Sequence, residues 1–335
     1  YISFHDTMDL SIAIRIATVY NDRIFFSVGG GVVYDSVPID EYQETIHKGK
    51  TIMETLNEKN KGNPKQEIVW INGSLRPVEQ AGVNITDLGL QYGYGFFETI
   101  RVDSGIPQFL EDHMERFNHA WRFLFGHNPP DLTWNDIVQR VIKGNGLENE
   151  TVALKIIATW GDRHTPPYSH TICVLARPYV HRLKGREKKG LRLGIYPDPH
   201  CSPLTDYKTL NYLYYFMAGR WAANNGYDEA ITLNSDRSVS ETNTANILLI
   251  NGGTVIQPVS PHVLPGVMEK NVLRFLEKKG YSIKRKKVMA EDLFSADSVI
   301  ITNSLIGAVP VLSIDGKDLK TSNGLMADLG KLNKY

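Results

Sequence analysis

Short apolar runs broken by turn residues dominate the chain from residue 68 to about 180. Residues 96–102 read FFETIRV, which alternates well enough for a strand, and Asp103-Ser104-Gly105 supplies a hairpin turn. The same pattern predicts further strands at 68–73, in a short run ending near Val78, at 152–159 and at 171–176. Amphipathic stretches predict helices at 109–125 and 131–143. This order favours an antiparallel sheet with helices on one side.

The second half of the chain mixes strands and helices in the same way. Strands are predicted at 191–196, 229–233, 245–250, 255–259 and 297–304. One helix is predicted at 211–225, where Gly226 suits a C-cap, and another begins after the turn at Gly266. The whole pattern therefore predicts the α+β fold class.

Polar segments divide the chain into parts. Residues 57–66 read NEKNKGNPKQ and hold no apolar face, which predicts a linker. The basic run HRLKGREKK predicts a second connection. We expect an N-terminal segment with strands at 12–17 and 23–28 and a helix at 40–56. The expected division is 1–56, a linker at 57–67, and two subdomains at 68–180 and 181–335.

Composition narrows the possible functions. The chain of 335 residues has no net formal charge, so it carries no electrostatic footprint for nucleic acid or an anionic membrane surface. Two cysteines provide no disulfide framework and indicate a reducing cytoplasm. No apolar run approaches the ~18 residues of a membrane span. Because residue 1 is Tyr and the chain opens within a pattern, we expect it to be part of a longer protein.

Lys208 precedes an apolar helix in the stretch SPLTDYKTLNYLYYFMAGRW. A lysine that can lose its charge suits Schiff-base chemistry, and a carboxylate that pairs with a pyridinium nitrogen completes such a site. Glu241, in the hydroxyl- and amide-rich run SETNTANI, is the candidate carboxylate. Taken singly, each residue is more simply a solvated surface group, so the interpretation depends on the other motifs.

The stretch GLQYGYGFFETIRVDSGIPQFLEDHMERF resembles the opening of the fold-type IV pyridoxal phosphate enzymes. That family includes branched-chain and D-amino acid aminotransferases and aminodeoxychorismate lyase. The resemblance, over residues 68–320, implies a fold of two subdomains and pyridoxal 5'-phosphate as cofactor. It implies that Arg116 binds the cofactor phosphate, to which a guanidinium fork is suited. It also implies that Glu98 lies in the substrate pocket near the catalytic lysine.

The same resemblance extends through the second half. Lys208, in KTLNY, matches the catalytic Schiff-base lysine, and Glu241 matches the partner of the pyridine nitrogen. Further cofactor-binding candidates are the first N–H groups of the helix after LPG and the end of the strand DSVIITNS, which correspond to Val267, Met268, Thr302 and Asn303.

The N-terminal segment resembles the C-terminal end of the chorismate-utilising synthases, through SIAIR, GGGVVYDS and EYQETIHK. In that family Arg15 would bind a substrate carboxylate, and Glu41 and Glu44 would be magnesium ligands with Lys48 nearby. We therefore expect Mg2+ to concern this incomplete synthase portion alone. The alternative for the charges at 41–48 is a solvated, salt-bridging helix face.

The two resemblances together imply consecutive steps toward 4-aminobenzoate in folate biosynthesis. The predicted activity is that of aminodeoxychorismate lyase, which converts 4-amino-4-deoxychorismate to 4-aminobenzoate and pyruvate. Met268 and ITNSLIGAVPV look lyase-like, whereas Glu98 is typical of the family's transaminases. A class IV aminotransferase and a non-catalytic scaffold that dimerises the synthase are the alternatives. A homodimer is what the family implies.

Trimming the chain to begin near Glu67 should leave lyase activity and melting temperature almost unchanged. The reason is that residues 1–56 supply one wall of the site that they resemble, so they should also lack chorismate activity by themselves. Activity assays and thermal unfolding of the full and trimmed chains check this. A large loss of either quantity would show that the segment is integral to the catalytic domain.

Overall fold

The computed structural model describes residues 66–162, 169–187, 189–320 and 329, together with the backbone of two strands near the N-terminus. The chain divides into two compact units, Tyr1–Gln66 and Glu67–Tyr335. In the first unit, β1 (Ile16–Tyr20) and β2 (Arg23–Ser27) form an antiparallel hairpin. β1 thus extends to Tyr20, beyond the predicted end of the first strand. Arg15, the predicted helix at 40–56 and its candidates Glu41, Glu44 and Lys48 lie outside the described residues.

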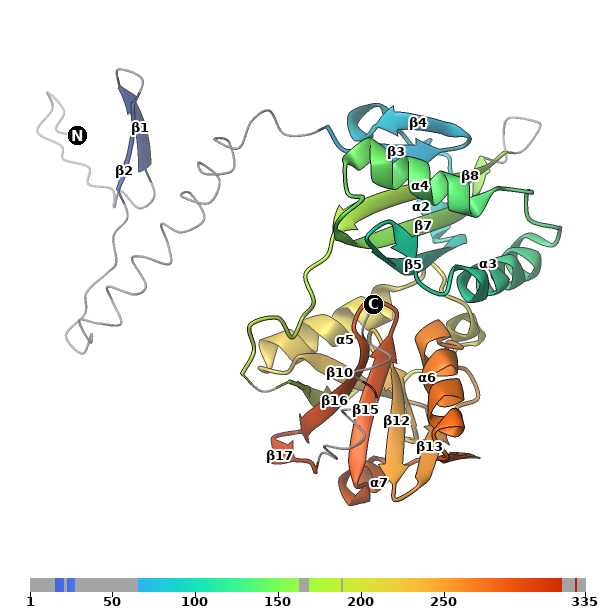
Figure 1. Ribbon diagram of the computed structural model, residues 1–335, viewed down its shortest axis with the longest axis vertical. Helices are drawn as coiled ribbons and strands as arrows, with labels where there is room; N and C mark the ends of the chain where they lie inside the picture. Colours follow the sequence, from blue (N-terminus) through green and yellow to red (C-terminus); the bar gives the residue numbers. More distant parts are fainter. Residues whose placement is uncertain are drawn as a thin grey trace, which may run out of the picture. The chain divides into compact units, whose positions relative to one another are not determined.

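Six antiparallel strands form the first sheet of the second unit, in the order β4-β3-β8-β7-β5-β6 (Figure 1). Their bounds are β3 Ile68–Ile71, β4 Ser74–Pro77, β5 Gly95–Asp103, β6 Ile106–Pro107, β7 Thr151–Asp162 and β8 Ser169–Pro178. Alternate residues of β7, such as Val152, Leu154 and Ile156, are fully buried, so one face of the sheet is core. Helices α3 (Leu110–Phe125) and α4 (Trp134–Asn145) pack on that face. The predicted antiparallel sheet with helices on one side is confirmed.

Nine strands of mixed direction form the second sheet, in the order β11-β10-β9-β16-β15-β12-β13-β14, with β17 paired to β16. Their bounds are β9 Leu191–Ile195, β10 Glu229–Leu233, β11 Val239–Thr242, β12 Asn246–Asn251, β13 Thr254–Pro258, β14 Ser282–Lys286, β15 Ser298–Asn303, β16 Gly307–Ile314 and β17 Lys317–Asp318. β9 runs parallel to β10 and β16, and β13 runs parallel to β14. Only residues 243–245 separate β11 from β12 along the chain, so the sheet curls and its β11 edge returns toward β12.

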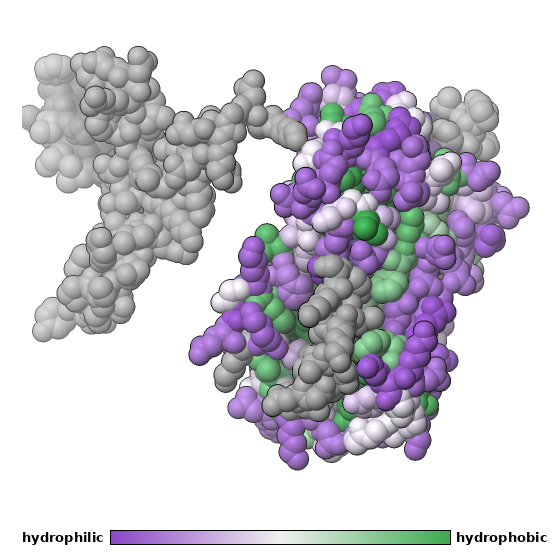
Figure 2. Space-filling model, in the orientation of Figure 1, coloured by the Kyte–Doolittle hydropathy of each residue, from purple (hydrophilic) through white to green (hydrophobic). Residues whose placement is uncertain are grey.

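Three helices accompany this curled sheet, namely α5 (Leu213–Asn224), α6 (Val267–Lys278) and α7 (Ala290–Ser295). α6 buries Met268, Val272 and Leu276 against β12, β13 and β15. No helix in the described part of the chain is long and apolar enough to cross a membrane. The face seen in Figure 2 is mostly hydrophilic, with apolar residues in small separate patches.

Four elements of the second sheet and its surroundings were not predicted from sequence: β11, β14, β16 and α7. β16 reads GAVPVLSI and is buried along almost its whole length, so it lacks the period-two signal of a half-exposed strand. β14 reads SIKRK and is largely exposed at the sheet edge, where charged residues are common. Pattern alone therefore undercounts strands at both extremes of burial.

Asp87 ties the short helix α2 (Leu88–Tyr92) to the first sheet. Its buried carboxylate accepts hydrogen bonds from Gly89 N at 2.7 Å, Thr159 Oγ1 at 2.7 Å and Thr171 Oγ1 at 2.8 Å. Asp87→Ala should lower the free energy of unfolding by about 2–4 kcal/mol, because it removes an N-cap and leaves donors unsatisfied. Denaturant titration checks this, with the exposed Asp131→Ala as control. A loss no larger than that of the control would contradict this role for Asp87.

Candidate functional site

Lys208 lies where the two sheets of the second unit meet. Phe97 N of β5 donates to Lys208 O at 2.8 Å, and Leu210 N donates to Gly95 O at 2.9 Å. Residues 208–210 therefore form a short extension of the first sheet, directly before α5 of the second subdomain. The Lys208 Nζ lies 4.8 Å from the centroid of the Phe97 ring and 5.3 Å from that of Tyr212. These contacts fix the amine against aromatic faces.

The charge of the Lys208 amine is held in balance. Burial lowers the pKa of Lys208 to about 8, and the positive charges of Arg116 and Lys155 act in the same direction. Glu98 and Glu241 oppose the change without cancelling it. An appreciable fraction of Lys208 is therefore a neutral, nucleophilic amine near neutral pH.

Glu241 is a buried carboxylate on β11 that faces the same region. The Tyr215 hydroxyl donates to its Oε1 at 2.6 Å. Burial raises the pKa of Glu241 to about 7, although Tyr215 and Lys208 partly oppose the rise. No ion pair to Glu241 occurs within the described residues. A protonated ring nitrogen would supply the missing counter-charge, so Glu241 fits its predicted role.

A cavity of about 130 Å³ lies beside these groups. Lys208, Tyr212, Tyr215, Glu241 and Asn246 are among its lining residues. The structure therefore brings Lys208 and Glu241 to one cavity, as their spacing in the sequence could not show.

Arg116 of α3 joins β5 to the turn before α6. Its Nε and Nη2 donate to the Glu98 carboxylate at 2.8 and 2.7 Å, and Nη1 donates to Pro265 O at 2.8 Å. Burial disfavours ionisation of Glu98, but Arg116 and His113 outweigh it and hold the pKa of Glu98 at about 2. Glu98 is thus an ionised partner of Arg116 and does not line the cavity beside Lys208.

Two residues of this network, His113 and Ser304, escaped the sequence analysis. The Nδ1 of His113 lies 2.8 Å from Glu98 Oε2, and its Nε2 lies 3.3 Å from Ser304 Oγ. Because Glu98 is ionised, Nδ1 carries the proton that it donates, and in the neutral ring Nε2 accepts from Ser304. The available signal was the spacing of His113 and Arg116 at i and i+3, which puts both on one helix face.

The turn into α6 is shaped by Gly266. A Cβ at this position would lie 2.0 Å from the Oδ1 of Asn246, so a side chain there has no room. Asn246 Nδ2 donates to Leu264 O at 2.9 Å and holds the turn against β12. α6 begins at Val267, as predicted, and no side chain caps Gly266. The buried Met268 side chain belongs to the apolar cluster under α6, so only its backbone could face an anion.

The ends of β15 and its turn hold the last two predicted residues. Thr302 is fully buried, and its hydroxyl has no hydrogen-bond partner in the described part of the chain. Asn303 instead organises the turn, because its Oδ1 accepts from the backbone N–H groups of Leu305 and Ile306, both at 2.9 Å. Neither residue lines the cavity beside Lys208.

Lys155 on β7 is a further cation that the sequence analysis missed. Its Nζ lies 4.5 Å from the centroid of the Phe97 ring, the ring that Lys208 also contacts. Burial and then Arg177 lower the pKa of Lys155. Within the described residues, no cluster of three or more histidine, cysteine or acidic side chains could hold a metal ion.

Comparison with known proteins identifies the group to which this site is related. Residues 95–314 match the amino-transferase class IV family, and residues 1–54 match the chorismate binding enzyme family. An aminodeoxychorismate lyase of Vibrio harveyi is 28% identical over 79% of this chain and 96% of its own length. A putative branched-chain-amino-acid aminotransferase of Methanocaldococcus jannaschii is 28% identical over 74% of this chain and 88% of its own.

Solved structures share the same fold. A branched-chain aminotransferase from Thermoproteus uzoniensis with norvaline superposes with a TM-score of 0.71 and 24% identity, covering 79% of this chain and 93% of its own. A Thermus branched-chain aminotransferase with pyridoxamine 5'-phosphate gives a TM-score of 0.71 and 22% identity, covering 80% and 93%. The predicted two-subdomain α+β fold is confirmed.

Glu98→Gln should lower the free energy of unfolding by about 3 kcal/mol at neutral pH, which corresponds to a pKa held near 2 instead of 4.5. Because the folded-state pKa is depressed, this stabilisation is present above 4.5 and is lost as the pH falls toward 2. The gap between wild type and variant should therefore narrow over that range. Denaturant unfolding at several pH values checks it, with the exposed Glu111→Gln as control. A gap independent of pH would contradict the ionised pair.

Proposed function

We propose, from the premise that this chain belongs to the amino-transferase class IV family, that it is a pyridoxal phosphate-dependent aminodeoxychorismate lyase. It would convert 4-amino-4-deoxychorismate to 4-aminobenzoate and pyruvate. The observation that carries this proposal is the presence, in one chain, of a chorismate-binding match at 1–54 and a class IV match at 95–314. We propose 1–56, 57–67, 68–180 and 181–335 as synthase remnant, linker, small subdomain and large subdomain.

The site residues fit pyridoxal 5'-phosphate. Lys208 offers an amine for the aldehyde, and Glu241 is a buried carboxylate that lacks an ion-pair partner in the described part of the chain. Arg116 and the backbone amides of Val267 and Met268 would hold the phosphate at the start of α6. Thr302 and Asn303 would lie near that phosphate or the substrate carboxylate. When bound, the cofactor supplies an electron-withdrawing ring next to the substrate carbon that bears nitrogen.

The protein side chains would then manage protons and charge. Neutral Lys208 is a base of suitable strength to take the proton from the substrate carbon and to return one to the product side. Glu241, with Tyr215 donating to it, would keep the ring nitrogen protonated. Lys155, on the Phe97 ring beside Lys208, is the cation best positioned to hold a substrate carboxylate. Loss of enolpyruvate would make the remaining ring aromatic.

A class IV aminotransferase is the second candidate, which several curated relatives support by name. Glu98 counted toward it in the sequence. In the fold Glu98 is bound by Arg116 and His113, so its effect on the choice of reaction would be indirect. A non-catalytic scaffold is a weaker candidate, because packing alone would not require Lys208, Arg116 and Glu241 together.

We also propose a homodimer. Three apolar residues on α5, Leu213, Phe216 and Met217, are 71%, 71% and 46% exposed. Their i, i+3, i+4 spacing puts them on one helix face. A second copy of the chain would cover this face beside the Lys208 segment.

Incubation with 4-amino-4-deoxychorismate should give 4-aminobenzoate and pyruvate in equal amounts, as followed by chromatography and a coupled pyruvate assay. Lys208→Ala should lower the rate at least about a thousandfold, because both proton transfers depend on that amine. Borohydride should fix the cofactor to the Lys208 peptide alone. Turnover of amino acid and oxoacid pairs, with no pyruvate from aminodeoxychorismate, would support the transaminase and sink the lyase.

A further inference from the structure

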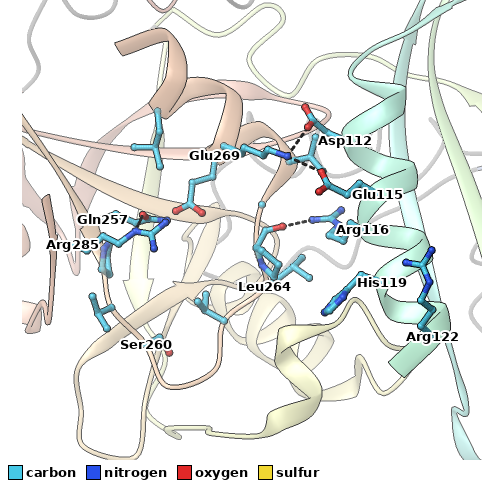
Figure 3. Close-up of a pocket in the computed structure, with 18 residues that line it drawn as sticks. Asp112, Glu115, Arg116, His119, Arg122, Gln257, Ser260, Leu264, Glu269 and Arg285 are labelled. Carbon is cyan, nitrogen blue, oxygen red and sulfur yellow. Dashed lines mark hydrogen bonds and ion pairs between the residues drawn. The ribbon is translucent and has the colours of Figure 1, made fainter. Parts of the chain in front are cut away.

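The largest cavity of the second unit, about 750 Å³, lies on the outer side of the turn that leads into α6. Figure 3 shows Arg116 and Leu264 between α3 on one side and Glu269, Gln257 and Arg285 on the other. Glu269 is only 8% exposed, although it contributes to the cavity wall. The catalytic role proposed above makes no use of this buried acid.

Glu269 lies at the third position of α6 and folds back over its first turn. A Cβ built on Gly266, the residue before the helix, would be 3.0 Å from the Glu269 Cβ. The Gly266 backbone amide and the Gln257 side chain both favour the ionised form of Glu269. The carboxylate therefore occupies the positive end of α6, the same end at which a phosphate would bind.

Nearby cations are committed to other partners. Arg116 donates to Glu98 and Pro265, and Lys270 pairs with Asp112 at 2.7 Å and Glu115 at 2.9 Å. Arg285 Nε donates to Gln257 Oε1 at 2.8 Å. Burial, only partly offset by Gln257, Arg285 and the Gly266 amide, raises the pKa of Glu269 to about 7. The negative charge of Glu269 also contributes to the raised pKa of Glu241.

We propose that Glu269 is a positioning residue that shares the first turn of α6 with the cofactor phosphate, so that binding of a phosphate-bearing ligand adds one proton to Glu269. Two anions at one helix terminus repel each other, and protonation of the carboxyl group removes that repulsion at the least cost. The cavity gives Glu269 access to solvent for this exchange. The inference rests on the proposed function, because pyridoxal phosphate is the ligand concerned.

The sign of the pH dependence follows from this linkage. Below about pH 7 Glu269 is already protonated in the free protein, so ligand binding needs no proton there. Above it, the bound state holds one proton more than the free state, and affinity falls by up to about tenfold per pH unit. The charged and titratable groups that surround Glu269 or share its cavity are Arg285, Glu241, Arg116, Asp112, Glu115, His119, Arg122 and Lys270.

The test compares wild type with Glu269→Gln, which keeps the shape and removes the titration. Apoprotein is titrated with pyridoxal phosphate by absorbance between about pH 6 and pH 8.5. Affinities should agree within about twofold at the low end, and the variant should bind about tenfold more tightly at the high end. Calorimetry in buffers of different ionisation enthalpy should show that the wild type takes up more protons than the variant.

Three controls sharpen the result. Glu277→Gln alters an exposed glutamate of the same helix and should behave as wild type. Pyridoxal, which lacks the phosphate, should bind with the same pH dependence to wild type and Glu269→Gln. Lys208 and Glu241 titrate in this range in every variant, so differences between variants report Glu269.

The outcomes separate the two proposals. Equal pH dependence and proton uptake in wild type and Glu269→Gln, with cofactor bound at Lys208, would overturn the role of Glu269 and leave the proposed function intact. Failure of every variant to bind pyridoxal phosphate at Lys208 would overturn both.

Discussion

The buried contact between Glu98 and Arg116 is the interaction on which the site depends. It joins β5 to α3, and through Pro265 it reaches the turn that begins α6, so one guanidinium links both subdomains. Removing one member of such a pair leaves an uncompensated buried charge, which typically costs about 3–5 kcal/mol. His113 extends the contact to Ser304 at the end of β15. The relative position of the sheets is therefore set by polar contacts as well as by apolar packing.

The charges around the site are arranged for a ligand that carries both an anion and a cation. Lys208 has a lowered pKa, whereas Glu241 and Glu269 have raised ones. Each group is buried without enough opposite charge, which is an electrostatic cost that a suitable ligand relieves. The curled second sheet creates this arrangement, because it returns β11, and with it Glu241, toward β12 and the start of α6.

Sequence motifs identified the residue types well but their contacts only in part. The start of α6 was predicted because Gly266 interrupts an amphipathic run, and the structure shows that Asn246 leaves no space for a larger residue. Asn303 was expected at the ligand, yet its carbonyl organises its own turn. His113 and Lys155 were missed, because a histidine in a helix and a lysine in a strand carry no local sign of what they face.

The sequence by itself determined the periodicities, the helix starts, the order of the motifs and the two family resemblances, since these depend on residues close together in the chain. Only the tertiary structure decided which charges meet. Glu98 and Arg116 are 18 residues apart, Ser304 is 191 residues from His113, and Glu269 acts on Glu241 from another element. Burial and distance set protonation and pairing, and both are properties of the folded chain that no local pattern encodes.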